Sequence, residues 1–271
     1  MFKPVTVVTG ASVGIGEALA RVFANNGHEV ALVARREKEM VLLANELAVS
    51  CKYKPHVITA DLQRSDAPAR IAHELLGRGL EPAIVVNNAG FGLHGEAADL
   101  DRAEQLAMLD LNVRALTDLS LRWIDGIVKH QGGILNVASV AGFLPGPGMA
   151  VYYASKAYVL SFTEALAREL EPKGVRVTAL CPGPVQTEFQ MRAGVESKKP
   201  SWLLRRTAEQ VAQAGYDGFM ARKRVVIPGV GNKFVSFLPR LLPRGLMLKT
   251  IEGYQRGRGR RAENRKKRPK F

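Results

Sequence analysis

Short apolar runs alternate with amphipathic stretches along most of the chain. The apolar runs, bounded by glycine, proline, asparagine or aspartate, predict buried strands, and apolar residues spaced three and four apart predict helices between them. The predicted strands are residues 3–9, Glu29–Ala34, His56–Ala60, Ala83–Val86, Gly133–Ala138, Val175–Leu180 and Arg224–Ile227. The predicted helices are Glu17–Asn26, Glu37–Val49, Ser65–Leu76, Arg102–Lys129, Tyr152–Leu170 and Thr207–Ala221, with a loop at Pro182–Ser201.

This alternation predicts an α/β protein with a doubly wound Rossmann-type fold, in which helices cover both faces of a mostly parallel, seven-stranded sheet. No repeat and no linker divides the chain, so residues 1–250 are expected to form a single domain and residues 251–271 a basic, flexible tail. In such sheets ligands bind beyond the carboxyl ends of the strands, where the strand order reverses. Several segments that carry candidate binding or catalytic residues follow predicted strands, so they can lie in one crevice.

Composition sets limits on the setting and the partners. The chain has 271 residues, 46% of them hydrophobic, which is enough for a sizeable core. Its net charge is +14, but nine Lys and Arg against two Glu in residues 252–271 supply half of that excess. The charge therefore describes the tail and does not indicate a specific nucleic-acid partner. Two cysteines far apart, Cys51 and Cys181, favour a reducing, cytoplasmic setting, with no metal site expected.

Two further patterns bear on localisation. No leader-like segment precedes the first strand, so secretion is not indicated, and no apolar window reaches the length of a membrane span. The segment Phe234–Leu248 mixes Phe, Leu and Met with proline and arginine. It is interpreted as a substrate lid, a subunit contact or a peripheral membrane contact, with packing in the core or an interface as the simpler alternative.

A glycine loop follows the first strand directly. Gly10, Gly14 and Gly16 are spaced G-x-x-x-G-x-G, and a helix begins immediately afterwards. Strand, glycine loop and helix is the arrangement in which a pyrophosphate meets free amide groups at a helix N-terminus. An ordinary strand-to-helix turn is the simpler alternative. The glycine loop lies at the first strand-to-helix junction of a wound sheet, however, and this position favours binding of a dinucleotide.

The end of the second strand bears on which dinucleotide binds. An NAD site usually places a carboxylate there to accept from the ribose 2′-hydroxyl. This chain has Ala34-Arg35-Arg36, and guanidinium groups suit a 2′-phosphate, so NADP(H) is favoured over NAD(H). Exposed arginines in a basic protein are the alternative. After the third strand, Asp61 either accepts from the adenine amino group or caps the turn before the next helix.

Tyr152 and Lys156 are four residues apart at the start of a predicted helix and share one face. A cation one turn away favours the phenolate and should lower the pKa of the phenol. Ser139, at the preceding strand end, can bring a second hydroxyl beside it. The three groups would form a proton-donating site for a carbonyl oxygen. A packed aromatic ring and a solvated lysine are the simpler interpretation of the pair.

Together these segments resemble the short-chain dehydrogenase/reductase family, in order and in spacing, over roughly residues 3 to 230. The matching segments are Thr9–Gly16, Asn87–Gly90, Asn112, Ser139, Tyr152-x-x-x-Lys156 and Pro182–Thr187. The resemblance implies a Rossmann-type oxidoreductase that moves a hydride between a nicotinamide cofactor and a carbonyl or alcohol carbon. It also implies a homodimer or homotetramer. Val13 departs from the Arg or Lys of many NADP-preferring relatives, which leaves the discrimination to Arg35 and Arg36.

The resemblance also implies roles for the candidate catalytic residues. Tyr152 exchanges a proton with the substrate oxygen, which Ser139 hydrogen-bonds. Lys156 lowers the pKa of the phenol, with burial and the nicotinamide charge assisting, and holds the nicotinamide ribose. Asn112, which by sequence alone is a surface or capping residue, resembles the family residue that anchors a water leading to Lys156. Tyr153 is expected to face another way and to pack.

The expected cofactor-binding residues fall in these same segments. They are Gly10, Ser12, Gly14, Ile15, Gly16, Arg35, Arg36, Asp61, Leu62, Asn88, Ala89, Gly90, Tyr152, Lys156, Pro182, Gly183, Val185 and Thr187. The candidate walls of the substrate pocket are Leu93, His94, Leu144, Phe189, Met191 and Trp202, mostly apolar. They favour a hydrophobic small-molecule carbonyl or alcohol. The alternative function is a nucleotide-sensing or scaffold protein on the same fold, with the basic tail as its partner-binding part.

Overall fold

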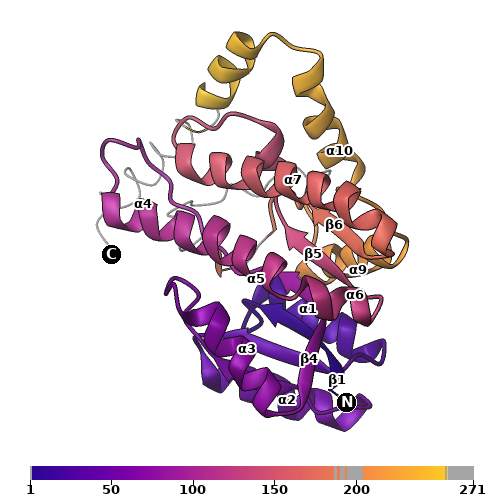
Figure 1. Cartoon of the computed structure of the whole chain (residues 1–271). Helices are drawn as coiled ribbons and strands as arrows, with labels where there is room; N and C mark the ends of the chain where they lie inside the picture. Colours follow the sequence, from indigo (N-terminus) through magenta and orange to yellow (C-terminus); the bar gives the residue numbers. More distant parts are fainter. Residues whose placement is uncertain (1, 186–187, 190–192, 194–203, 254, 256–271) are drawn as a thin grey trace.

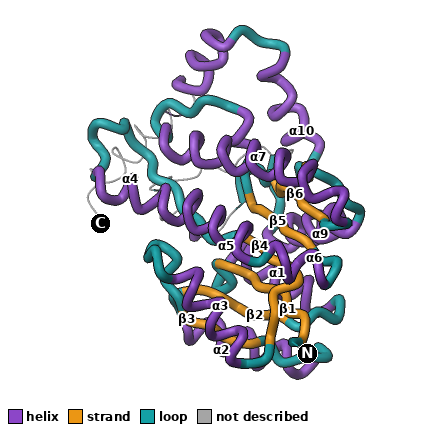
Figure 2. Tube along the Cα trace, viewed as in Figure 1, coloured by secondary structure: helices purple, strands orange, loops and turns teal. Residues whose placement is uncertain are grey.

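The computed structural model describes residues 2–185, 188–189, 193, 204–253 and 255. Within them seven strands form one sheet in the order β3-β2-β1-β4-β5-β6-β7, and all neighbouring strands are parallel (Figures 1 and 2). The strands are β1 (Lys3–Thr9), β2 (Val30–Ala34), β3 (His56–Thr59), β4 (Leu80–Asn87), β5 (Gly133–Val137), β6 (Arg176–Leu180) and β7 (Val225–Val226). The predicted α/β fold is confirmed.

Helices connect the strands and lie close to their predicted positions. They are α1 (Gly14–Asn25), α2 (Glu37–Ser50), α3 (Ala67–Gly77), α4 (Arg102–Leu109), α5 (Leu116–Arg122), α6 (Ile124–Lys129), α7 (Ala150–Leu170), α9 (Ala208–Met220) and α10 (Val230–Phe237). Shorter helical turns are η1 (Asp110–Ala115), η2 (Val140–Phe143), η3 (Glu171–Lys173) and η4 (Leu238–Arg240).

The sheet is buried between two layers of helices, because alternate residues of a strand point to opposite faces. In β2, Val30, Leu32 and Ala34 belong to one apolar cluster, and Ala31 and Val33 belong to the other. Helices α1, α2 and α9 close the first cluster, and α3, α5, α6 and α7 close the second. Helices on both faces leave only the edges of the sheet for a ligand.

The strand order reverses between β1 and β4, and their carboxyl ends are tied together. The Thr9 hydroxyl accepts from the backbone N–H groups of Asn88 (2.9 Å) and Ala89 (3.0 Å). The Asn88 side-chain amide donates to the Thr9 carbonyl oxygen (2.9 Å). These bonds hold the glycine loop against the segment after β4, at the point where a wound sheet binds ligands.

Helix α1 begins at Gly14, three residues before its predicted start, and helix α10 was not predicted. Two further differences concern β4 and the helical region before β5. Strand β4 begins at Leu80 rather than Ala83, because Leu80 and Glu81 pair with Lys3 and Pro4 across a shifted register that the hydrophobic pattern does not reveal. The predicted helix over residues 102–129 contains a π-helical turn, η1, and is interrupted at Trp123. This π-helical turn carries Asn112.

The chain after α10 continues as a second helical stretch, residues 244–253, and Gln255 beyond it is only 2% exposed. Residues 251–253, which the sequence analysis assigned to the tail, belong to this helical stretch. Thr187, Met191, Trp202 and residues 256–271 lie outside the described residues. None of the described helices is both long enough and apolar enough to cross a membrane.

Candidate active site

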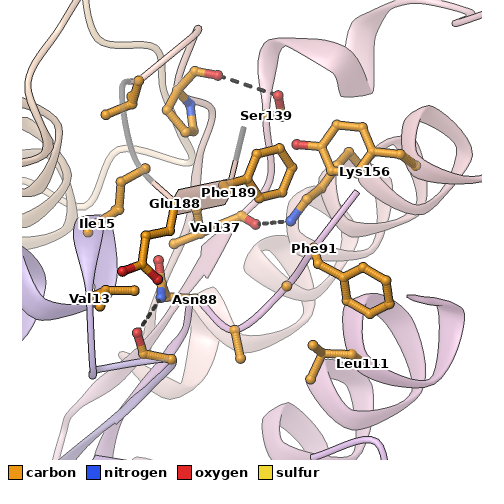
Figure 3. A pocket seen from close by; sticks show the side chains of 18 of the residues that line it. Val13, Ile15, Asn88, Phe91, Leu111, Val137, Ser139, Lys156, Glu188 and Phe189 are labelled. Atoms are coloured by element: carbon orange, nitrogen blue, oxygen red, sulfur yellow. Dashed lines mark hydrogen bonds between the residues drawn. The ribbon is translucent and has the colours of Figure 1, made fainter. Parts of the chain in front are cut away.

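A cavity of about 500 Å³ lies at the carboxyl edge of the sheet (Figure 3). The expected site residues that line it are Gly10, Ser12, Gly14, Ile15, Gly16, Arg35, Arg36, Asp61, Leu62, Asn88, Ala89, Gly90, Ser139, Tyr152, Lys156, Pro182, Gly183 and Val185. Tyr152 and Lys156 come from α7, and the others follow the carboxyl ends of six different strands, from β1 to β6. The fold thus brings together the segments that the sequence analysis selected.

The glycine loop is shaped by backbone demands that other residues do not meet. Gly10 and Gly14 have φ angles of +65° and +62°, in the left-handed region that favours glycine. At Gly16 a side chain would collide with the carbonyl oxygen of Gly10 and the side-chain amide of Asn88. The loop can therefore turn this tightly and pack against Asn88 only with glycine at these positions.

The N-terminus of α1 faces this loop. Its N-cap residue is Val13, which offers no side-chain hydrogen bond to the free amide groups of the first turn. Such uncapped N–H groups, together with the helix dipole, favour a bound anion. Gly14, Ile15 and Gly16 all line the cavity. The arrangement fits a pyrophosphate.

At the end of β2, Arg35 is exposed and Arg36 is half-buried, and both line the cavity. The Arg36 guanidinium pairs with the Glu188 carboxylate (Nη1 to Oε2, 2.9 Å) and donates from Nε to the Ser12 hydroxyl (3.4 Å). Glu188 lies 152 positions away in the sequence, and no local pattern marked it. Two cations therefore border the cavity here, one of them already paired with a carboxylate.

Asp61 follows β3 and lines the cavity, where its carboxylate oxygen Oδ1 accepts from the backbone N–H of Gln63 (3.1 Å). This bond is the turn-capping interaction that was one of the two expectations for Asp61. A carboxylate has a second oxygen, so contact with an adenine amino group stays a prediction.

The β5 side of the cavity carries the three candidate catalytic side chains. Ser139 follows β5, and its hydroxyl donates to the Pro182 carbonyl oxygen (3.4 Å) and accepts from the Ala141 N–H (3.1 Å). Tyr152 and Lys156 lie on α7, 9% and 5% exposed. The Lys156 ammonium donates to the Val137 carbonyl oxygen (2.8 Å; Figure 3). It lies 6.0 Å from the centre of the Tyr152 ring.

Burial dominates the electrostatics of this pair. It raises the pKa of the Tyr152 phenol above its ordinary value, although the Ser139 hydroxyl acts in the opposite direction. Burial also lowers the pKa of Lys156 to about 8. The expectation that Lys156 and burial lower the pKa of Tyr152 is therefore wrong for the protein alone. Its phenol is held in the protonated form.

Asn112 does not lie on the surface or cap a helix. It is fully buried in the π-helical turn η1. Its side chain accepts from the Phe91 N–H (3.1 Å) and donates to the Phe91 carbonyl oxygen (2.9 Å) and the Ser155 hydroxyl (3.1 Å). A side chain added to Gly90 would stand 2.9 Å from Asn112 Oδ1 and 3.5 Å from Lys156 Nζ. Asn112 thus lies directly behind the cavity and fixes the backbone that lines it.

Replacing Asn112 by alanine should lower the free energy of unfolding by about 3 kcal/mol, because buried groups of Phe91 and Ser155 lose this partner. Urea titration measures the change. The matched control is Asn26→Ala, whose amide bonds the Val22 carbonyl at an exposed position and should cost less than about 0.5 kcal/mol. Equal losses in the two variants would contradict the role assigned to Asn112.

The wall beside Tyr152 is largely apolar. The Phe189 ring packs on the Tyr152 ring with centroids 5.4 Å apart, and Leu144 and Met149 also line the cavity. Tyr153 was expected to face away, but it lines the same cavity, and its hydroxyl accepts from Gln255 Nε2 (3.0 Å).

The remaining predicted wall residues are placed differently. Leu93 borders a smaller neighbouring hollow, together with Met149 and Tyr152. His94 does not appear among the side chains that border the main cavity. The apolar wall is thus formed by residues from α7, from the segment before it and from the segment after β6.

Comparisons with known proteins agree with this geometry. A family model described as short chain dehydrogenase matches residues 4–198. The chain is 36% identical over 217 residues to sulfoacetaldehyde reductase 2 of Chromohalobacter salexigens, covering 77% of this chain and 85% of that protein.

Solved structures include similar folds. A short-chain dehydrogenase from Sphingobium yanoikuyae in complex with NADPH has a TM-score of 0.77 and 32% identity, covering 90% of this chain and 95% of that one. The bulky-bulky ketone specific alcohol dehydrogenase from Comamonas testosteroni has a TM-score of 0.73 and 28% identity, covering 90% and 96%.

Proposed function

Because this chain belongs to the short-chain dehydrogenase family and is an oxidoreductase, we propose that it transfers a hydride between NADP(H) and the carbonyl or secondary alcohol carbon of a hydrophobic substrate. One observation carries the proposal. Ser139, Tyr152 and Lys156 line the same cavity as the glycine loop, although they are more than 120 residues away from it in sequence. A proton donor and a nucleotide cradle in one crevice are what this reaction needs.

The residues on the nucleotide side fit the cofactor. The uncapped first turn of α1, where Gly14, Ile15 and Gly16 line the cavity, would hold the pyrophosphate. Arg35 and Arg36 would hold the 2′-phosphate, and Asp61 the adenine amino group. When bound, the nicotinamide supplies or accepts the hydride. That the neighbouring structure from Sphingobium yanoikuyae binds NADPH supports this choice.

In the protein alone, burial keeps the Tyr152 phenol protonated but makes it a weaker acid. Proton donation to a substrate oxygen would therefore need the positive charges of Lys156 and of a bound nicotinamide to lower the pKa of Tyr152 toward the working pH. The Ser139 hydroxyl beside it can hydrogen-bond the same oxygen as negative charge develops there. Lys156 contributes a buried ammonium, held by the Val137 carbonyl, and would bind the nicotinamide ribose.

Asn112 is proposed to support Lys156 through the backbone of Phe91 and the side chain of Ser155. Lys156 and Ser155 are adjacent on α7, so this network fixes the turn that presents the ammonium. The proposed remaining cofactor contacts are Leu62, Ala89, Gly90, Pro182, Gly183 and Val185, which border the cavity, and Thr187, which lies outside the described residues.

The lowered pKa of Lys156 predicts a pH dependence of stability. Between a folded-state pKa of about 8 and an ordinary value of about 10.5, the unfolded chain binds more protons at this group, so stability should rise with pH. The wild type should gain up to roughly 1.4 kcal/mol per pH unit relative to Lys156→Met as the pH rises from 8 to 10. Urea titrations at several pH values measure this. The control Lys38→Met removes an exposed ammonium on α2, and a difference no larger than its own would contradict the prediction.

The substrate is proposed to be hydrophobic, such as a fatty-acyl, retinoid or steroid-like carbonyl compound. The apolar side chains of Leu144, Met149 and Phe189 support this, and no carboxylate clamp lies beside Tyr152 among the described residues that line the cavity. The test is oxidation of NADPH with a panel that contrasts bulky apolar ketones with small charged aldehydes. The proposal fails if NADPH binds but no carbonyl compound oxidises it, and the substrate class fails if only small charged aldehydes do.

The enzyme is also proposed to work in the cytoplasm and to assemble as a homodimer or homotetramer. The observation that supports assembly is that Leu106, Leu121 and Tyr158 are exposed on α4, α5 and α7. Burying such side chains between copies is favourable. Light scattering in solution tests this, and a monomeric mass at all concentrations would contradict it.

A further inference from the structure

Helix α10 is oriented with its polar side inward. Val230, Phe234 and Phe237 have the spacing of one helix face, and they are 78%, 65% and 49% exposed. Asn232 and Ser236 lie on the opposite face and are almost fully buried. A helix that covers a protein core normally shows the reverse arrangement. The exposed apolar face of α10 is therefore a candidate surface for contact with a partner.

Specific hydrogen bonds fix this orientation. Asn232 Nδ2 donates to the carbonyl oxygens of Pro228 (2.7 Å) and Leu204 (3.3 Å). The Asn232 side chain also lies directly against Gly183, where a side chain on the glycine would collide with it. If the helix turned its apolar face inward, these hydrogen bonds would break and Asn232 would lose its buried partners. The outward face is thus built into the packing.

The apolar surface continues past α10. Leu241, one helical turn beyond Phe237, is 67% exposed, and Leu246 and Leu248 in residues 244–253 are 53% and 38% exposed. Figure 1 shows that α10 and this second helical stretch extend beyond α7 and away from the sheet. We call the exposed side chains of Val230, Phe234, Phe237, Leu241, Leu246 and Leu248 the apical apolar surface.

Positive charge is concentrated in the same part of the chain. Residues 230–271 contain thirteen Lys and Arg against two Glu, a net +11 of the total +14. Lys233, Arg244 and Lys249 are exposed beside the apical apolar surface. An apolar surface next to basic side chains, followed by a basic segment, is the combination that binds the interface of an anionic membrane.

We propose that the apical apolar surface docks on an anionic lipid bilayer and lies in its headgroup region without crossing it. A second copy of this chain is a poorer occupant, because two such segments would bring like charges together. Single-stranded RNA would use the charge and stack on aromatic rings, but four of the six side chains are aliphatic and offer no stacking face. Docking would place the enzyme where hydrophobic substrates dissolve, although it does not depend on the proposed activity.

The test is cosedimentation of the full chain with phosphatidylcholine vesicles, with and without phosphatidylglycerol. The wild type should bind the anionic vesicles at least tenfold more strongly, and added salt should weaken this binding. Phe234→Ser combined with Phe237→Ser should lower the partition coefficient on anionic vesicles by at least about tenfold, because two aromatic side chains that would be buried in the bilayer are lost. Both side chains are exposed, so the fold should survive, and thermal unfolding checks this.

The matched control is Leu42→Ser combined with Val49→Ser, two exposed apolar residues on α2 that are 69% and 91% exposed. It should bind anionic vesicles like the wild type. The proposal is overturned if the wild type shows no preference for anionic vesicles, or if the Phe234/Phe237 variant binds as well as the wild type. It is also overturned if that variant instead dissociates a dimer, or loses binding to single-stranded RNA while vesicle binding is unchanged.

Discussion

Tyr152→Phe is expected to lower kcat for ketone reduction by about 10³-fold, while NADPH binding changes little. The variant removes one hydroxyl from a buried side chain that touches the apolar ring of Phe189 and lies close to Ser139. Its ring and packing stay in place. The variant lacks the proton that the substrate oxygen receives. A 10³-fold fall in kcat corresponds to an increase of about 4 kcal/mol in the activation free energy.

The control for this prediction is Tyr158→Phe on the same helix. Tyr158 is 40% exposed, and its hydroxyl bonds the Thr117 hydroxyl (3.0 Å) away from the cavity. It undergoes the same chemical change, so kcat should stay within about twofold of the wild type. Initial rates of NADPH oxidation at saturating substrate give kcat, and quenching of protein fluorescence by NADPH gives the dissociation constant. If Tyr152→Phe retained the wild-type kcat, Tyr152 would not be the proton donor.

Much of the fold and of the nucleotide side could be predicted because the signals are local. Strand β1 and the glycine loop adjoin in sequence, and α1 begins where the loop ends. Gly10 and Gly14 have positive φ angles, which glycine adopts readily, so the residue type itself indicates this backbone conformation. Parallel strands then collect their carboxyl ends at one edge, whichever helices lie between them. The gathering of these residues in one cavity follows from that rule.

The features that escaped prediction depend on contacts between distant residues. Asn112 is polar and lies in a helical pattern, so nothing local showed that a π-helical turn buries it behind Phe91. The ion pair between Arg36 and Glu188 joins the end of β2 to the segment after β6, which meet at the cavity although three strands separate β2 from β6 in the sheet. The sign of the pKa shift at Tyr152 was wrong because sequence spacing reveals a nearby cation but not the degree of burial. Burial decides the sign here.

Arg35→Asp combined with Arg36→Ala is expected to lower the ratio of kcat/KM for NADPH to that for NADH by about 10²-fold to 10³-fold. Each charge-assisted hydrogen bond to the 2′-phosphate contributes about 1.5–3 kcal/mol, and the new carboxylate would repel the phosphate and accept from the ribose 2′-hydroxyl of NADH. Steady-state kinetics with both cofactors measure the ratio. An unchanged ratio would contradict a 2′-phosphate site at these arginines.

A control with the same change in net charge separates local contact from the overall field. Arg122→Asp combined with Arg168→Ala alters two exposed arginines on α5 and α7 that do not line the cavity. The ratio should change less than about twofold, because exposed charges beyond a screening length interact weakly. A fall as large as that of the Arg35/Arg36 variant would show that long-range charge, and not a built site, sets the preference.

Glu188 decides how the two arginines share this effect. Its carboxylate occupies Arg36, so a 2′-phosphate must share or displace it, whereas Arg35 is exposed at the cavity edge. Half-exposed ion pairs contribute only about 0–1 kcal/mol, so Glu188 cannot exclude a phosphate but reduces the net contribution of Arg36. Glu188→Gln should therefore raise the NADPH preference by about two- to fivefold, and Arg35→Ala should cost more than Arg36→Ala. A lower NADPH preference in Glu188→Gln would mean that the carboxylate positions Arg36 for the phosphate instead of competing with it.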